Sequence, residues 1–277
     1  MQSSGGDTSR FWLDVMVGNK DCVGEARKID LQSLISSISA KNDSDVEQID
    51  LDLKRNLGRA PRQIPAIRTI LLSWVILNSG IGYSQGMDTI CIVLYNYFCQ
   101  SNSPQPEHDA LASLGFVCRV NAGYLPLHNH DRAPVSNAAL FASEIWLEVS
   151  ATRPRLGAKI LPALECFEVF ALQHMSVCFA NLFETDVIQT VWGYLFRGEG
   201  NGADRGAALK LAARRCRHFV SACVVHHEKL WMFGRDERQS YGIWERLLGI
   251  MDKRIALKVL DVALYLERVE RFGGAAR

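Results

Sequence analysis

The chain has 277 residues, which is enough for one large domain or two small ones. With 48% hydrophobic and 22% charged residues, its composition is that of a soluble globular protein. The formal net charge of +1 excludes a global electrostatic attraction to nucleic acid or to an anionic membrane, so any basic binding site must be local.

Neither the start of the sequence nor its most apolar run predicts export or membrane insertion. Residues 1–9 are polar, are expected to be flexible and lack the pattern of a signal peptide. The most apolar run, Met87 to Cys99, is too short to cross a bilayer, which needs roughly 20 residues. The eight cysteines are scattered and contain no Cys-x-x-Cys pair, which favours reduced thiols. We therefore expect a cytoplasmic protein.

The first third of the chain predicts short helices separated by polar turns. One helix is expected over 9–18, closed by a glycine, and another over 30–38, with Asp30 as its N-cap. A polar loop is expected over 39–45. Pro65 can then lie in the first turn of a helix whose apolar residues recur at helical spacing up to Asn78.

The run from Met87 to Cys99 is apolar nearly all round and predicts a central buried element. Its β-branched residues would also suit a strand, but its length and its helical neighbours favour a helix. Further helices are expected over 111–124, 136–149, 159–175, 179–197, 207–227, 241–251 and 254–272. No strand alternation, hairpin signal or internal repeat is found. The predicted class is all-α, with a soft boundary near 151–160 between two helical subdomains.

Several common sites are missing from the sequence. There is no Gly-x-x-x-x-Gly-Lys-Ser/Thr loop, so the chain is not expected to bind a nucleoside triphosphate itself. There is also no Gly-x-Ser-x-Gly and no His-Glu-x-x-His motif. Candidate zinc ligands are Cys216, His218, Cys223, His226 and His227. Their spacing does not give the two close ligand pairs of structural zinc, and the polar loop 128–131 is equally weak. We expect no metal, and a helix with buried thiols and surface imidazoles.

A basic stripe follows the same predicted helix. Lys210, Arg214 and Arg217 lie at i, i+4 and i+7. Such a stripe is typical of a solvated helix face, and docking of an acidic partner or of lipid headgroups is the alternative.

Two short polar motifs stand out between residues 49 and 100. In the first, Arg55 lies three residues after Asp52, whose carboxylate could orient the guanidinium. In the second, Gln85 lies between Gly82 and Gly86 in a turn where glycines permit unusual dihedrals and close approach of another backbone. An oriented arginine could offset charge on phosphoryl oxygens, and a glutamine could aim a water. A structural ion pair and a turn amide are the alternative interpretation.

Together, Ile49-x-x-Asp52-x-x-Arg55 and Gly82-Tyr83-x-Gln85-Gly86-Met87 resemble the paired motifs of the TBC domain family, which are GTPase-activating proteins for Rab GTPases. Weaker similarities extend the resemblance along most of the chain. They involve Arg10, Trp12, Gly18, Leu182, Phe183, Val191 and Trp192.

The resemblance implies an all-helical, two-lobed TBC-type domain over 10–277, with a groove that holds the GTPase. The N-terminal lobe would cover about 10–155 and carry both motifs, and the C-terminal lobe would cover about 156–277. The partner would be a Rab-family small GTPase in the GTP state, which carries GTP and Mg²⁺, so the chain would need no cofactor of its own. No nucleic-acid partner is expected. Recruitment to endomembranes through this partner would fit a role in vesicle trafficking.

The resemblance also implies roles for individual residues. Arg55 would be an arginine finger, and Gln85 would stand in for the glutamine of the GTPase. Asp52 would orient Arg55, while Tyr83 would support the glutamine turn and touch the GTPase. Ile49, Gly82 and Gly86 complete the expected supporting or GTPase-binding set.

The sequence departs from the family pattern at a few positions. Asn56 follows the arginine where the family often has Thr, and Asp88 follows Gly-Met where it often has Asn. These two changes could alter local hydrogen bonding and weaken catalysis. Thr190 and Gly193 replace a charged pair of the second half, which would remove a structural ion pair. A non-catalytic scaffold of the same fold that binds a small GTPase, and an unrelated hydrolase or metal protein, are the alternative hypotheses.

Overall fold

The computed structural model describes residues 24–38, 43–56, 61–122, 135–161, 167, 171–175, 177–181, 183–196, 205–229 and 252–273. In these segments the regular elements are all helical, which confirms the predicted all-α class. The chain divides into two compact units, Met1–Ala122 with Gly198–Ala208, and Gly123–Arg197 with Leu209–Arg277.

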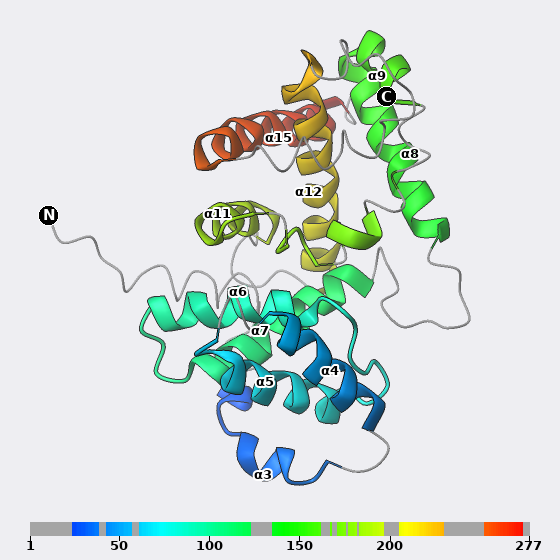
Figure 1. Cartoon of the computed structure of the whole chain (residues 1–277). Coiled ribbons are helices and arrows are strands. Elements are labelled where there is room, and N and C mark those ends of the chain that lie inside the picture. The colour runs from blue at the N-terminus through cyan, green and yellow to red at the C-terminus, as the bar shows by residue number, and fades with distance from the viewer. Residues whose placement is uncertain are drawn as a thin grey trace, which may run out of the picture. The chain divides into compact units, whose positions relative to one another are not determined.

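The first unit contains the helices that carry both polar motifs (Figure 1). They are α3 (Leu31–Ile35), α4 (Asp43–Arg55), α5 (Ile64–Leu77), α6 (Met87–Gln100) and α7 (Pro106–Ala122). As predicted, Asp30 caps α3, because its carboxylate accepts hydrogen bonds from the backbone N–H groups of Gln32 and Ser33 at 3.1 and 3.2 Å. Pro65 lies in the first turn of α5, and Asn78 ends that helix with a backbone bond to the Trp74 carbonyl.

Helix α6 forms the centre of this unit. It packs against α5 and α7, and its side chains Ile90, Cys91, Leu94 and Phe98 are at most 2% exposed. The prediction of a helix rather than a strand is thereby confirmed. Burial on nearly all sides explains why its sequence has no polar face.

Three predicted limits in this unit were wrong. Helix α3 ends at Ile35, earlier than the helix predicted over 30–38. Helix α4 begins at Asp43, so the loop predicted over 39–45 ends earlier, and 39–42 lie outside the described residues. Helix α7 begins at Pro106 rather than near residue 111, with Glu107 and Asp109 in its first turn. Proline at a helix start and acidic side chains near the positive end of the helix dipole both favour this earlier beginning.

The second unit is also helical. It contains α8 (Val135–Thr152), α9 (Pro154–Ile160), the π-helical turn η3 (Ala171–Met175), α11 (Thr185–Leu195), α12 (Arg205–His226) from Leu209 onward, and α15 (Lys253–Gly273). The division between the units falls at Ala122, whereas the soft boundary was expected near 151–160. Helix α8 packs on α9, which places it in the second unit.

The predicted helices of this unit match unevenly. Those over 207–227 and 254–272 are confirmed as α12 and α15. The helix predicted over 179–197 begins only at Thr185, because Cys178 and Phe179 have φ values of 47° and 65°, which no right-handed helix allows. Residues 171–175 form a π-helical turn and not the end of one helix over 159–175. The helices predicted over 9–18 and 241–251 lie outside the described residues.

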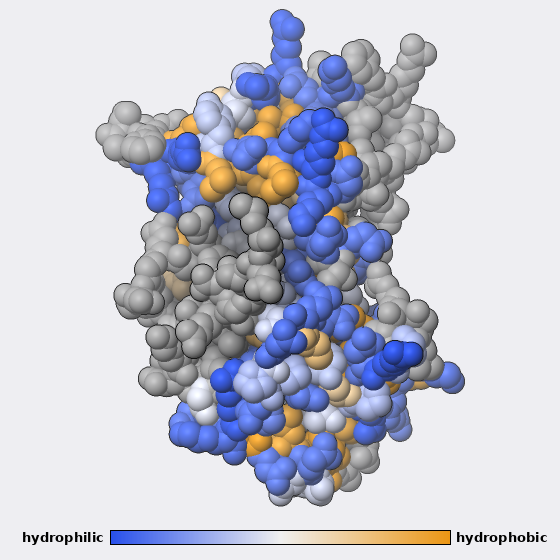
Figure 2. All heavy atoms as spheres, turned by 90° about the vertical axis from the view of Figure 1, so that its left-hand side faces the viewer, coloured by the Kyte–Doolittle hydropathy of each residue, from blue (hydrophilic) through white to orange (hydrophobic). Residues whose placement is uncertain are grey.

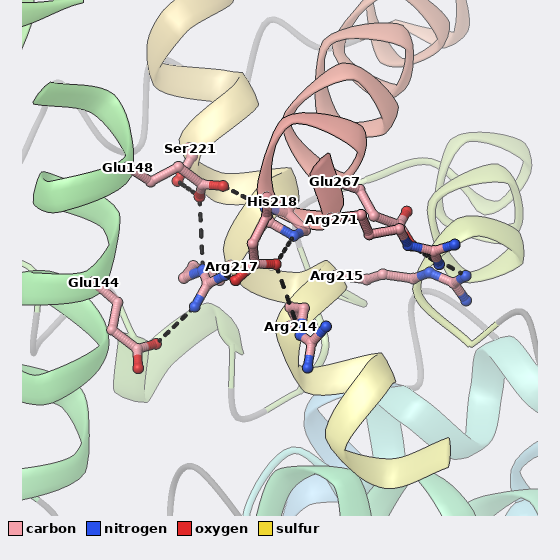
Figure 3. Close-up of polar contacts among 10 residues, drawn as sticks. Glu144, Glu148, Arg214, Arg215, Arg217, His218, Ser221, Glu267 and Arg271 are labelled. Atoms are coloured by element: carbon pink, nitrogen blue, oxygen red, sulfur yellow. Dashed lines mark hydrogen bonds and ion pairs between the residues drawn. The ribbon is translucent and has the colours of Figure 1, made fainter. Parts of the chain in front are cut away.

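A buried polar network joins three helices of the second unit (Figure 3). The His218 side chain on α12 is fully buried and lies between Glu148 of α8 and Glu270 of α15. Arg217 is only 16% exposed and contacts the same two carboxylates. The expectations of surface imidazoles and of a solvated basic stripe were therefore wrong at these two residues, because carboxylates of neighbouring helices cover this face of α12.

The surface mixes apolar and hydrophilic side chains. On the face drawn in Figure 2, small apolar groups interrupt a largely hydrophilic surface. Scattered exposed apolar residues, such as Tyr265 and Leu140 at 60% and 62%, are normal for a folded domain. Within the described part of the chain, no helix has both the length and the apolar character needed to cross a membrane.

Candidate functional site

The two polar motifs meet at the carboxylate of Asp52, one turn before the end of α4. Asp52 is 3% exposed and accepts three side-chain hydrogen bonds. Gln48 donates to it at 3.0 Å, Arg55 at 2.6 Å and the Tyr83 hydroxyl at 2.9 Å. A buried carboxylate is stable only when such donors satisfy it, so Asp52 draws both motifs together.

Arg55 is the last residue of α4 and is held at one end only. Its Nη1 donates to Asp52, yet 64% of its side chain is exposed, against 4% for the Asp52 side chain. The predicted contact between these two residues is therefore present. Fixing one edge of a planar guanidinium while the rest faces solvent leaves donors available to an anion.

Ile49 has a different position from the rest of the first motif. It is fully buried, one turn before Leu53 and on the core side of α4. Its contribution is therefore to the packing of α4 on the core, and it presents no surface to a partner.

Tyr83 anchors the second motif from inside the unit. Its backbone N–H donates to Asp45 at 3.2 Å, and its hydroxyl lies 2.9 Å from Asp52 and 3.3 Å from Asp88. Burial, together with the charges of Asp88 and Asp52, raises the pKa of Tyr83 far above its ordinary value, so the phenol stays a donor. At 3% exposure it supports the turn, and little of its ring is left for the expected contact with a GTPase.

Gly82 and Gly86 bracket this turn with left-handed backbone conformations. Their φ values are +70° and +96°, which residues other than glycine rarely adopt. A Cβ on Gly82 would also lie 3.2 Å from the Asp45 carboxylate, and the Gly82 carbonyl accepts a hydrogen bond from Trp74 at 3.0 Å. Both glycines are thus required by the shape of the turn.

Gln85 lies in this turn, two residues after the Tyr83 anchor. Its side chain is exposed, and Gly86 immediately after it caps the N-terminus of α6. The structure therefore places the carboxamide on a short turn fixed at both ends, in the unit that also presents Arg55.

Asn56 and Asp88, the two departures from the family motifs, are brought together. The Asn56 amide donates to Asp88 Oδ2 and also approaches the Asp52 carbonyl at 3.4 Å. Asp88 is 3% exposed. Burial is the main cause that raises the pKa of Asp88, and the charge of Asp52 adds to it, while a hydrogen bond from the Thr89 backbone opposes it.

The sequence analysis did not identify three supporting residues: Asp45, Gln48 and Trp74. Asp45 and Gln48 precede Asp52 by seven and four positions, which is one helical face. Recognising that α4 begins before the Ile49 motif would have shown both. For Trp74 the sequence gives no signal, because its bond to the turn depends on how α5 packs.

The described residues contain no group of three or more histidine, cysteine or acidic side chains that could hold a metal ion. Burial raises the pKa of Cys216 and of Cys223, which disfavours the thiolate that zinc requires. The loop 128–131 lies outside the described residues.

In chemical terms, this site presents an exposed cation and an exposed amide, both supported by buried residues that hydrogen-bond to one another. These supporting residues need little reorganisation when an anion binds, because their donors and acceptors are already paired. The arrangement suits electrostatic stabilisation of a phosphate held by another molecule.

Comparison with known proteins identifies the family and the fold. A family model described as the Rab-GTPase-TBC domain matches residues 15–212. The crystal structure of the Chlamydomonas flagellar RabGAP TBC domain is 16% identical, with 92% of this chain and 77% of that chain covered and a TM-score of 0.60. The Ypt/Rab-GAP domain of Gyp1p is 13% identical, with 90% and 80% covered and a TM-score of 0.65. No match was found among curated proteins. At these identities the two structures show a shared fold.

Proposed function

Because the chain belongs to the Rab-GTPase-TBC domain family, we propose that it is a GTPase-activating protein for a Rab GTPase, with Arg55 and Gln85 supplied in trans as its arginine and glutamine fingers. TBC domains act on Rab GTPases, and the GTP-bound form of one Rab would be the substrate complex. Any requirement for GTP and Mg²⁺ would be met by that partner.

One observation carries the proposal: the hydrogen-bonded path from Arg55 through Asp52 to Tyr83. It connects the two motifs across 31 positions of sequence and leaves 64% of the Arg55 side chain exposed. The path therefore connects an exposed guanidinium to the turn that carries Gln85.

The proposed chemistry assigns one task to each finger. The Arg55 guanidinium would offset the charge that grows on the phosphoryl oxygens as the γ-phosphate leaves. The Gln85 amide would accept from and donate to the attacking water, and so aim it in line. An arginine supplied in trans is worth about 10³–10⁵ in rate in such systems. Asp52 and Tyr83 would hold the two groups in place.

The direct test measures phosphate release from a panel of GTP-loaded Rab proteins under single-turnover conditions. Wild-type protein should accelerate at least one Rab, and Arg55→Ala and Gln85→Ala should each lose most of that acceleration. Arg68→Ala is the matched control, because Arg68 is an exposed arginine of the same unit that pairs with Asp50 at 2.6 Å. It should retain full activity.

The same panel separates the alternatives. If wild-type protein accelerates no Rab but binds the GTP form of one, the non-catalytic scaffold is the better description. If Arg55→Ala is as active as the wild type, the named mechanism is wrong even though stimulation exists. Cytoplasmic localisation and recruitment to endomembranes through the Rab stay predictions.

A further inference from the structure

Asn56 and Asp88 hydrogen-bond across 32 positions of sequence, between the ends of two helices. Asn56 is the residue that follows α4, and Asp88 is the second residue of α6. Both side chains also bond to the backbone of these helix ends, since the Asn56 amide approaches the Asp52 carbonyl at 3.4 Å and Asp88 accepts from the Thr89 N–H. Their contact therefore connects two helix ends.

This contact completes a closed set of four residues, which we call the polar circuit: Asp52, Asn56, Tyr83 and Asp88. Asn56 donates to Asp88 and approaches the Asp52 carbonyl, while the Tyr83 hydroxyl lies 2.9 Å from Asp52 and 3.3 Å from Asp88. Both carboxylates are 3% exposed. In such a circuit each residue has two neighbours, so moving one strains the others.

The two proposed fingers lie directly beside the circuit. Arg55 precedes Asn56 in the chain, and Gln85 lies between Tyr83 and Asp88. On the basis of the proposed function, we propose that Asn56 and Asp88 are a positioning pair that fixes the Gln85 turn relative to the Arg55 end of α4. This pair would set the placement of both fingers on the partner's phosphate without touching it.

The number of available protons gives the pair a distinctive chemistry. Tyr83 has one O–H, so it can donate to only one of its two carboxylate neighbours at a time. An asparagine at 88 would accept from Asn56 through its oxygen and donate to the Tyr83 oxygen through its amide. Asp88→Asn therefore keeps the whole circuit. Asn56→Asp instead places a carboxylate next to the carboxylates of Asp88 and Asp52. Their repulsion breaks the circuit.

The exchange Asn56→Asp with Asp88→Asn restores the pair with its polarity reversed, since the amide at 88 then donates to the carboxylate at 56. A residue that only fills space would not be rescued in this way. Asp50→Asn is the matched control, because Asp50 lies on the exposed side of α4 and pairs with Arg68 outside the circuit.

The first measurement is stimulated GTP hydrolysis by the full chain on its Rab. Asn56→Asp should lower kcat about 10- to 100-fold while KM for the Rab changes less than about twofold, since misplaced groups near a reacting phosphate cost that much. Asp88→Asn, the exchange variant and Asp50→Asn should stay within about threefold of the wild type. A double variant as slow as Asn56→Asp would overturn the proposal.

The second measurement needs no GTPase, so it tests the pair even if the proposed function fails. Amide hydrogen exchange of residues 82–87 should become at least about fivefold faster in Asn56→Asp and return to the wild-type rate in the exchange variant. Asp50→Asn should leave it unchanged. Unchanged exchange in Asn56→Asp would overturn the positioning pair. If hydrogen exchange changes as expected in both variants but no Rab is stimulated, the positioning pair is upheld and the proposed activity is rejected.

Discussion

The polar circuit of the first unit and the network around Glu148 in the second unit both contain carboxylates that contact an arginine. They differ in how much of that arginine is exposed. Beside the first, the cation Arg55 is 64% exposed and contacts one carboxylate of the circuit, Asp52 on its own helix, at 2.6 Å. In the second, Arg217 is 16% exposed and contacts Glu144, Glu148 and Glu270 at 3.5, 3.7 and 2.6 Å (Figure 3).

This difference separates binding from stabilisation. In the network around Glu148, Arg217 and His218 of α12 contact carboxylates of α8 and α15. The network therefore connects three helices and leaves little unpaired charge for a ligand. The circuit has buried carboxylates, and the neighbouring cation Arg55 stays at the surface. Electrostatic interaction with a partner requires an exposed cation such as Arg55, because a fully paired cation has no donors to offer.

Removing the exposed cation should have the largest effect on activity and only a modest one on stability. Arg55→Ala is expected to lower stimulated GTP hydrolysis about 10³-fold or more, since the proposed arginine finger would act on the transition state. Its free energy of unfolding should fall by only about 1–2 kcal/mol, because the buried Asp52 carboxylate loses one donor but keeps those of Gln48 and Tyr83. Parallel phosphate-release and urea-unfolding experiments measure both. A large loss of stability would contradict the assignment of Arg55 to binding.

Breaking the network around Glu148 should do the opposite. Glu148→Ala removes the partner of the buried His218, of Ser221 and of Arg217, and is expected to cost about 3–5 kcal/mol of unfolding free energy. The rate per folded molecule should be unchanged. Urea titration gives the loss.

The control for that experiment is Asp186→Asn, which removes an exposed pair with Lys253 at 3.8 Å and should cost less than about 1 kcal/mol. If Glu148→Ala and Asp186→Asn lose equal amounts of unfolding free energy, the buried network is no more stabilising than an exposed ion pair.

A smaller and mixed effect is expected from Tyr83→Phe. The change leaves Asp52 and Asp88 without the hydroxyl and should cost about 1–3 kcal/mol, because buried acceptors lose a donor. Stimulated hydrolysis should fall about tenfold as the Gln85 turn loosens. Thermal unfolding and phosphate release measure the two effects, with Tyr265→Phe, 60% exposed, as the neutral control. Full activity in Tyr83→Phe would show that the hydroxyl does not position the turn.

The smallest effect expected is a difference in pH dependence. Burial raises the pKa of Asp88 above its ordinary 3.8, so its contribution to stability is full below that value and is lost as the pH rises through the folded-state pKa. At Glu270 burial is outweighed by the hydrogen bond and charge of Arg217 and the charge of His218, which lower the pKa below 4.5. That contribution is present above 4.5 and is lost as the pH falls.

The two substitutions Asp88→Asn and Glu270→Gln test these opposite signs. Relative to the wild type, Asp88→Asn should gain stability as the pH is raised from about 4 to 7, and Glu270→Gln should lose it. Unfolding temperatures at a series of pH values give the comparison. Parallel trends in the two variants would contradict it.

Much of the fold could be predicted because it follows from local sequence. The periodicity of α12 and α15, the Asp30 cap and the apolar run of α6 each determine an element within a few residues. The Arg55–Asp52 contact also follows from i, i+3 spacing on one helix. These features need no knowledge of how helices pack.

The remaining features depend on packing between distant segments. The Asn56–Asp88 bond exists because the end of α4 lies beside the start of α6. Two departures from the family motifs that look independent in sequence therefore form a hydrogen bond. His218 is buried because carboxylates of α8 and α15 reach it. The late start of α11 follows from positive φ values at Cys178 and Phe179, where no glycine marks the turn.

If both catalytic groups come from this chain, a Rab that lacks its own catalytic glutamine should still be stimulated, and this is the most direct test. Single-turnover GTP hydrolysis by the wild-type Rab and by its Gln→Leu variant should both be accelerated by this protein, because Gln85 would replace the missing side chain. Acceleration of both should be lost with Gln85→Ala and with Arg55→Ala. A Gln→Leu Rab that this protein cannot accelerate, although it accelerates the wild-type Rab, would contradict the claim.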